Sequence, residues 1–251
     1  MALRRSSDPV PFDAAATHVC LLGGFSVRMA SGALDLAPGC QRLLAFLGLG
    51  ARRFRRSTVA GTLWPDSSEV RAHASLRSTL ARLQRARGGV VDASSTEIGL
   101  ADAVTVDFDG AREAAYALLR PPTRPVDADA GRVLVDLLST DLLPGWYDDW
   151  VLLETESWRQ LRLHALEVLS HSLAAAGHFG DATLAALAAV TADPLRESAH
   201  AALITVHLAE GNRSEALRSY AQYRTLLARA LGIEPTRKLR DLVDGRAGTS
   251  P

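Results

Sequence analysis

The chain has 251 residues with 28 basic and 28 acidic side chains, so its formal net charge at pH 7 is zero. The charge is unevenly distributed, because residues 40–88 hold ten arginines and two acids whereas residues 89–251 hold 15 basic and 23 acidic residues. No run of about 18 apolar residues is present, which excludes a membrane-spanning helix, and the concentrated positive charge favours a polyanionic partner such as nucleic acid.

A small sheet is predicted near the N-terminus. Residues 1–16 lack the apolar centre of a signal peptide, and we expect them to form a disordered tail. In HVCLLGGFSVRM and GALDL, apolar residues alternate or form short runs, with Gly23-Gly24 and Ser31-Gly32 as turns. These runs predict short strands that pair with one another.

Three helices are predicted after this sheet. The first spans 41–48, the second spans 57–64 and is ended by Pro65, and the third spans 71–87 and is ended by two glycines. Strand-like runs then flank a polar turn at 94–96, which predicts a hairpin. A sheet, three helices and a hairpin are typical of a winged helix-turn-helix, in which the third helix enters the major groove.

The third helix carries the candidate DNA-binding surface. Leu76, Leu80 and Leu83 form one stripe with Ala72 beside it, and this stripe is the expected buried face. Small residues and arginines lie opposite, a mixture that lets the backbone approach a groove while guanidinium groups reach bases or phosphates. The residues that we expect to read the groove are Arg71, Ser75, Ser78, Arg82 and Arg85. Those expected to hold phosphates are Arg52, Arg53, Arg55 and Arg56.

Packed helices are predicted for the C-terminal half, at 107–119, 129–139, 150–158 and 159–176. Gly177, followed five residues later by Ala182, recurs as Gly211 followed by Ala216, and the interval of 34 residues is that of tetratricopeptide repeats. Stacked helix pairs of this kind leave a concave face that binds partners. A stripe along the last long helix is predicted to be core, and it comprises Ala216, Tyr220, Tyr223 and Leu227.

Three tryptophans, Trp146, Trp150 and Trp158, follow the chain break at Pro144-Gly145. They could form a ligand cage, but we expect them to pack the start of the helical half against the winged helix. Cys20 and Cys40 lie in apolar stretches without metal-ligand spacing, and we interpret them as reduced core residues of a cytoplasmic protein.

No catalytic residue, metal ligand or cofactor site is predicted. The sequence lacks GxxxxGK, GxSxG, HExxH and GxGxxG motifs, so we expect no enzyme activity. His164, His171 and His178 recur every seven residues, as do His200 and His207, and this spacing is too long for one metal ion on a helix. We interpret these histidines as surface residues.

Several stretches in order resemble the Streptomyces antibiotic regulatory proteins, over about residues 18–243. They include LLGGFSVRM, CQRLLAFL, LWPDSSEVRAHASLRSTLARLQR, LLPGWYDDWVLLETESWRQLRLHALE and AEGNRSEALRSYAQYRTLLARALGIEP. The chain departs from the family pattern at Arg55, where a small polar helix cap is usual, and at Ala81, where tryptophan is common. The resemblance implies a winged helix followed by a bacterial transcriptional activator domain, side-by-side binding to promoter direct repeats, and recruitment of RNA polymerase holoenzyme through sigma factor.

The expected fold is therefore an α+β winged helix-turn-helix domain followed by an all-α tetratricopeptide-like domain. We place a disordered tail at 1–16, the winged helix at 17–104 and the helical domain at 105–251. The expected function is a cytoplasmic transcriptional activator that binds double-stranded DNA and, as the resemblance implies, controls a biosynthetic gene cluster. Two alternatives remain open on sequence alone, a repressor and a protein-interaction module with weak or absent DNA binding.

Overall fold

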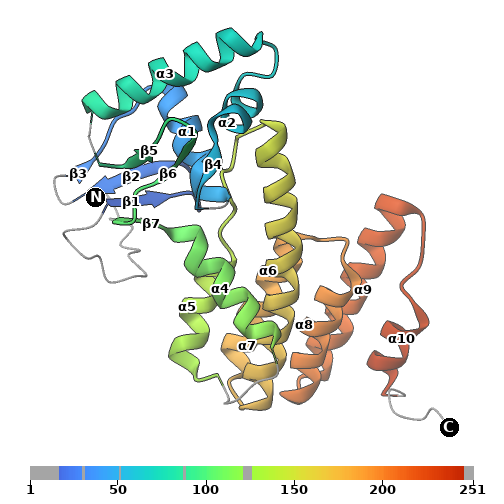
Figure 1. The fold of residues 1–251 in the computed structure, drawn as a ribbon. Helices are drawn as coiled ribbons and strands as arrows, with labels where there is room; N and C mark the ends of the chain where they lie inside the picture. Colours follow the sequence, from blue (N-terminus) through green and yellow to red (C-terminus); the bar gives the residue numbers. More distant parts are fainter. Residues whose placement is uncertain (1–16, 30–31, 51, 87–88, 121–125, 246–251) are drawn as a thin grey trace, which may run out of the picture. The chain divides into compact units, whose positions relative to one another are not determined.

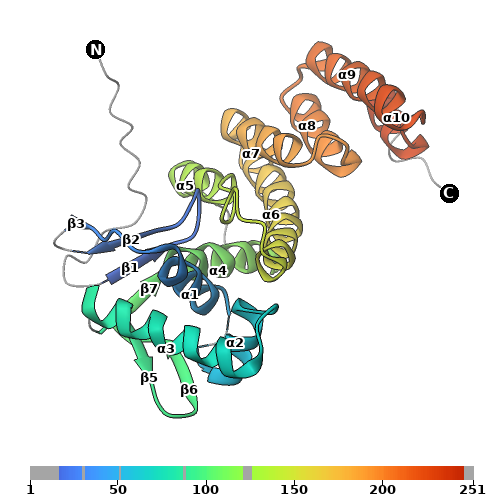
Figure 2. The ribbon, with the colours of Figure 1, turned by 90° about the horizontal axis from the view of Figure 1, so that it is seen from above.

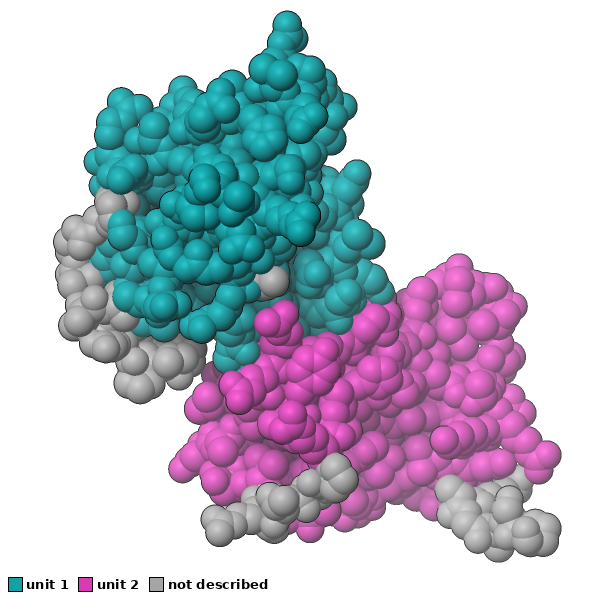
Figure 3. Space-filling view, viewed as in Figure 1, with its two compact units in different colours: residues 1–111, 140–158 teal, residues 112–139, 159–251 magenta. Residues whose placement is uncertain are grey.

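The chain divides into two compact units in a computed structural model (Figures 1 and 3). The first unit comprises 1–111 and 140–158, and the second comprises 112–139 and 159–251. The structure describes residues 17–29, 32–50, 52–86, 89–120 and 126–245, so the expected tail at 1–16 lies outside the described residues. The first unit contains an α+β winged helix and the second is built of stacked helices, which confirms the predicted fold class.

A four-stranded sheet lies at the N-terminus of the first unit, with the strand order β3-β2-β1-β7. Its strands are β1 (Thr17–Cys20), β2 (Ser26–Met29), β3 (Gly32–Ala33) and β7 (Val104–Val106). β1 and β2 are antiparallel across the predicted turn, in which Gly23 and Gly24 have φ values of 72° and 132° that favour glycine. β7 pairs in parallel with β1, with Thr17 opposite Val104, a long-range pairing that the sequence pattern did not predict.

The predicted helices and hairpin follow as the winged helix. Its helices are α1 (Pro38–Leu49), α2 (Arg56–Leu63) and α3 (Glu69–Ala86), and a second sheet of order β4-β6-β5 contains β4 (Phe54–Arg55), β5 (Val91–Ala93) and β6 (Glu97–Leu100). The core that holds the three helices against β6 includes Leu43, Val59, Leu63, Leu76 and Ile98. The β5–β6 hairpin projects beyond α3 in Figure 2, as a wing does.

Glycine is required at position 99, where β6 passes the chain before β4. A methyl group at this position would lie 2.1 Å from the backbone oxygen of Arg52. Gly99→Ala should therefore lower the free energy of unfolding by about 1–3 kcal/mol, the usual cost of overpacking, as measured by urea unfolding. Gly110→Ala is the matched control, because nothing lies within 4 Å of the added methyl group. Equal stabilities of the two variants would contradict the close approach of the backbone at Gly99.

The three tryptophans pack within the first unit, on rings of the winged helix and of the helix that follows it. Trp146 lies 5.8 Å from Phe25 and Trp150 lies 5.3 Å from Phe46, both measured between ring centroids. Trp158 meets Phe108 edge to face, and its indole nitrogen donates to the Thr140 backbone oxygen at 3.0 Å. These contacts confirm the predicted packing role of the tryptophans.

A single helix, α6 (Asp149–Ala175), spans 27 residues where the sequence pattern predicted two. The prediction of two helices that meet at residues 158 and 159 was wrong. Residues 149–175 contain no glycine or proline, and the apolar face continues across residue 158. As a result, residues 149–158 of α6 belong to the first unit and residues 159–175 to the second.

The second unit is a stack of tetratricopeptide-like helices. Besides the end of α6 it contains α5 (Ala128–Leu138), α7 (Phe179–Ala192), α8 (Glu197–Ala209), α9 (Arg213–Leu231), α10 (Arg237–Asp244) and most of α4 (Asp107–Leu119). α7 packs on α8 and α8 on α9, as Figures 1 and 2 show. Gly177 and Gly211, 34 residues apart, both have positive φ, at 83° and 86°, in the turns after α6 and α8. The predicted repeat is thus present in the backbone.

The predicted stripe on α9 is part of the core, since Ala216, Tyr223 and Leu227 are buried and Tyr220 packs against them. His200 corrects the expectation that all the histidines are on the surface. It is 6% exposed, stacks on Tyr223 at 4.1 Å between ring centroids, and its Nε2 lies 2.9 Å from the Pro194 backbone oxygen. Burial lowers the pKa of His200, which favours the neutral ring.

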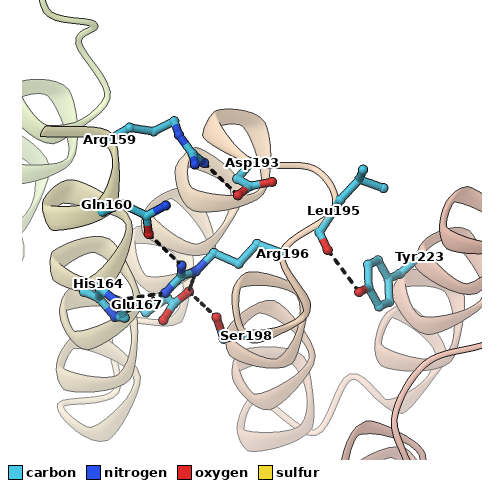
Figure 4. A network of polar contacts seen from close by, with 9 residues as sticks. All are labelled: Arg159, Gln160, His164, Glu167, Asp193, Leu195, Arg196, Ser198 and Tyr223. Atoms are coloured by element: carbon cyan, nitrogen blue, oxygen red, sulfur yellow. Dashed lines mark hydrogen bonds and ion pairs between the residues drawn. The ribbon is translucent and has the colours of Figure 1, made fainter. Parts of the chain in front are cut away.

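A polar network connects α6 with the corner between α7 and α8 (Figure 4). Arg196 donates to the Glu167 carboxylate at 2.7 Å, and Ser198 donates to the same oxygen at 2.7 Å. Arg159 lies eight residues before Glu167 on α6, and it donates to Asp193 at 2.7 Å. Because Arg196 and Glu167 are largely buried and each has its partner, the network fixes this corner of the helical stack.

Candidate nucleic-acid interface

α3 presents a basic face to solvent because its other face is tied to the winged-helix core. Ala72, Leu76, Thr79 and Leu83 are its buried residues, spaced at three and four positions. The Cys40 thiol of α1 approaches the Thr79 backbone oxygen at 3.7 Å, which marks how closely the two helices pack. The helix has an acid, Glu69, in its first turn and Arg85 in its last, as the helix dipole favours.

Four of the five residues predicted to read the groove are exposed, namely Arg71, Ser78, Arg82 and Arg85, and Ser75 is half-buried. Sequence reasoning missed Arg77, which is also exposed. The reason is that the predicted stripe included Leu80, whereas the structure buries Thr79 and leaves Leu80 only half-buried. The exposed side of α3 is therefore rotated toward Arg77 relative to the predicted one. Counting every arginine of the helix would have found this residue.

The arginines before α2 are placed beside the wing. Arg53 forms an ion pair with Asp92 of β5, and Arg52 lies 3.6 Å from Asp102. The pKa of Arg53 is raised, chiefly by its hydrogen bond to Asp92. Such exposed pairs contribute little free energy, so phosphate oxygens can compete for these guanidinium groups. The exposed Arg55 side chain has no hydrogen-bond or ion-pair partner among the described residues.

The turn of the wing is held by its own hydrogen bonds and by Arg56. The Ser94 hydroxyl accepts from the backbone N–H groups of Thr96 at 3.2 Å and Glu97 at 3.0 Å. The Arg56 guanidinium donates to the Ser94 backbone oxygen at 3.1 Å. Because the wing carries the acids Asp92 and Glu97, the cationic surface lies on α3 and at Arg55, with the wing beside it.

Arg55 is also the residue before α2, and it provides no side-chain cap for that helix. The departure from the family pattern noted at this position is therefore visible as an uncapped helix start. α2 nevertheless begins at Arg56, one residue before the predicted start, and ends at Leu63. Its buried residues Val59, Ala60 and Leu63 hold it in place through the core.

The rest of the described surface offers no comparable site. Two open hollows of about 510 and 430 Å³ lie along α9, around Ala221 and Thr225. In the described part of the chain, no three His, Cys, Asp or Glu side chains come together so that they could hold a metal ion. Both cysteines are free thiols, Cys40 buried and Cys20 half-buried, and burial raises the pKa of each. None of the helices in the described ranges is long and apolar enough to cross a bilayer.

Comparison with known proteins places the helical half in a family. Residues 130–244 match the model of the bacterial transcriptional activator domain. The chain is also 29% identical over 259 aligned positions to the regulatory protein AfsR of Streptomyces griseus, an alignment that includes 93% of this chain. Both matches agree with the expected resemblance to the Streptomyces antibiotic regulatory proteins. The chain spans 25% of the length of AfsR.

A solved structure supports the same architecture for this chain. Mycobacterium tuberculosis EmbR, in complex with a low affinity phosphopeptide, aligns with a TM-score of 0.69 over 94% of this chain and 66% of the EmbR chain, at 20% identity. At that identity the similarity shows the fold, a winged helix followed by helices, and no more. This chain and EmbR thus share the same fold.

Proposed function

We propose that this chain is a sequence-specific DNA-binding transcriptional activator. The observation that carries the proposal is the exposed face of α3, on which four arginines project without any acid after Glu69. Arg71, Ser75, Ser78, Arg82 and Arg85 keep their proposed role in reading the groove, and Arg77 joins them. The wing would lie near the adjacent minor groove. The residues proposed to hold phosphates beside it are Arg52, Arg53, Arg55 and Arg56.

Two physical features support this docking. Ala74, Ser78 and Ala81 are small and exposed, so they allow the helix backbone to approach base edges closely. The arginines around them are long enough to reach either base edges or the phosphates that flank the groove. An ordinary exposed helix carries acidic residues among its basic ones, whereas the acidic residue of α3, Glu69, lies in its first turn.

The helical half is proposed to carry the activating function. Its family description, bacterial transcriptional activator domain, and the name of its relative, a regulatory protein, support this assignment. We further propose that copies bind promoter direct repeats side by side, recruit RNA polymerase holoenzyme through sigma factor, and control a biosynthetic gene cluster. In this scheme residues 17–104 bind DNA and residues 105–251 act on transcription.

DNA binding is tested by fluorescence anisotropy across a salt series, with DNA from upstream of the neighbouring genes. If about six phosphates are contacted, affinity should fall about 10³-fold between roughly 50 and 200 mM salt, because each contact releases condensed counterions. Scrambled DNA of the same length is the control for sequence preference. A flat salt response, or no binding at low salt, would mean that the basic face is only solvated and that the chain is an interaction module.

The direction of regulation needs a second assay. In vitro transcription with purified polymerase should give more transcript from the bound promoter when the protein is added. A decrease would assign the chain as a repressor, which the winged helix permits equally well. DNA fragments without the bound repeats provide the baseline.

A further inference from the structure

Val70 is an apolar residue that is exposed to solvent and has no packing role in the fold. It is 78% exposed, whereas every other large apolar side chain in the described residues of 17–111 is buried or half-buried. It lies in the first turn of α3, between Glu69 and Arg71, and contributes nothing to the core on the opposite face of the helix. An apolar side chain displayed this far into solvent, on the helix proposed to enter DNA, requires a separate account.

The residues around Val70 form an apolar line through the basic face. Ala74 follows after four residues and Ala81 after seven more, and both are exposed on the same side of α3. Arg77, seven residues after Val70, lies on this same side of α3, and Arg71 lies about a quarter of a turn away. The outward side of α3 thus combines apolar side chains with arginines, and this mixture matches a groove floor with both hydrogen-bonding edges and methyl groups.

Only one feature of the major-groove floor is apolar. Thymine displays its C5 methyl group there, and apolar side chains recognise thymine through this methyl group. In helix-turn-helix proteins, base contacts come from the N-terminal residues of the recognition helix, and Val70 is the second residue of α3. Arginine cannot supply this discrimination, because its guanidinium group recognises acceptors.

We propose that Val70 is a specificity-determining residue that packs on the C5 methyl group of a thymine in the operator. This inference rests on the proposed function, because it requires α3 to lie in the major groove. It goes beyond that function by naming the base and the atom that Val70 recognises. Arg71 and Arg77 then read or hold polar atoms next to that thymine.

The test removes the methyl group from either side of the contact. Sites are first selected from a random DNA pool with the full chain, and each thymine of a selected site is then replaced by deoxyuridine, which keeps the hydrogen-bonding edge. At one thymine the replacement should weaken wild-type binding about four-fold, the contribution of one buried methyl group. For Val70→Ser, which has no methyl group, the same replacement should cause no further loss.

Two further variants keep the test decisive. Leu217→Ala removes another exposed apolar side chain, 46% exposed on α9, and should retain the wild-type response to deoxyuridine. Val70→Asn replaces both methyl groups by an amide, so it tests the same contact should Val70→Ser show altered thermal unfolding. Equal deoxyuridine effects in wild type and in both Val70 variants would overturn the inference while leaving DNA binding intact. If no sequence is selected, the proposed function fails and the inference fails with it.

Discussion

Arg82→Glu should weaken binding to the selected DNA by about 100-fold at roughly 100 mM salt. A well-placed arginine contact in the major groove contributes about 1–3 kcal/mol, and a carboxylate at the same place adds repulsion from nearby phosphates. Arg82 is exposed, and no carboxylate partner is assigned to it within the described residues, so the change should leave folding unaffected. Fluorescence anisotropy with specific and scrambled DNA measures the loss.

The control for this prediction is Arg213→Glu, which makes the same charge change on the exposed start of α9. Its effect should be limited to long-range repulsion and should disappear at higher salt, because exposed charges are screened over about 10 Å at 0.1 M. Equal losses in the two variants would show that affinity depends on net charge alone. In that case the assignment of α3 as the reading helix is wrong.

Trp158→Ala should lower the free energy of unfolding by about 3–5 kcal/mol, the usual cost of truncating a buried aromatic ring. Trp158 is 2% exposed, and its truncation would remove the edge-to-face contact with Phe108 and the hydrogen bond to the Thr140 backbone oxygen. Urea unfolding followed by circular dichroism measures the change, since far-ultraviolet signals do not depend on the deleted fluorophore.

Tyr147→Ala is the matched control, since this ring belongs to the same segment but is 81% exposed. It should change stability by less than about 0.5 kcal/mol. Trp158→Phe should lie between the two, because it keeps a ring against Phe108 but loses the donor to Thr140. A Trp158→Ala variant as stable as Tyr147→Ala would contradict the structural role of the tryptophan cluster.

Local periodicity predicted most of the winged helix and the helical stack. The spacing of Leu76 and Leu83 gave the buried side of α3, and the recurrence of Gly177 at Gly211 gave the two turns of the repeat. The hairpin followed from its polar turn. These features depend on residues close in sequence, so one chain is sufficient to infer them.

The features that were missed depend on distant neighbours. The pairing of β7 with β1 joins segments more than 80 residues apart, and three apolar residues do not encode their partner. His200 is buried because Tyr223 lies across from it, which spacing along one helix does not show. The rotation of the α3 face toward Arg77 arises from the packing of Thr79 near α1.

Helix α6 has a consequence for how genes of this kind can recombine. Because residues 149–158 belong to one compact unit and 159–175 to the other, no loop between residues 140 and 175 separates the two units cleanly. A chimaera joined at residue 104 would take Trp146 and Trp150 from one parent and their ring partners Phe25 and Phe46 from the other. Exchanges that preserve folding are therefore expected to carry residues 140–158 together with the winged helix.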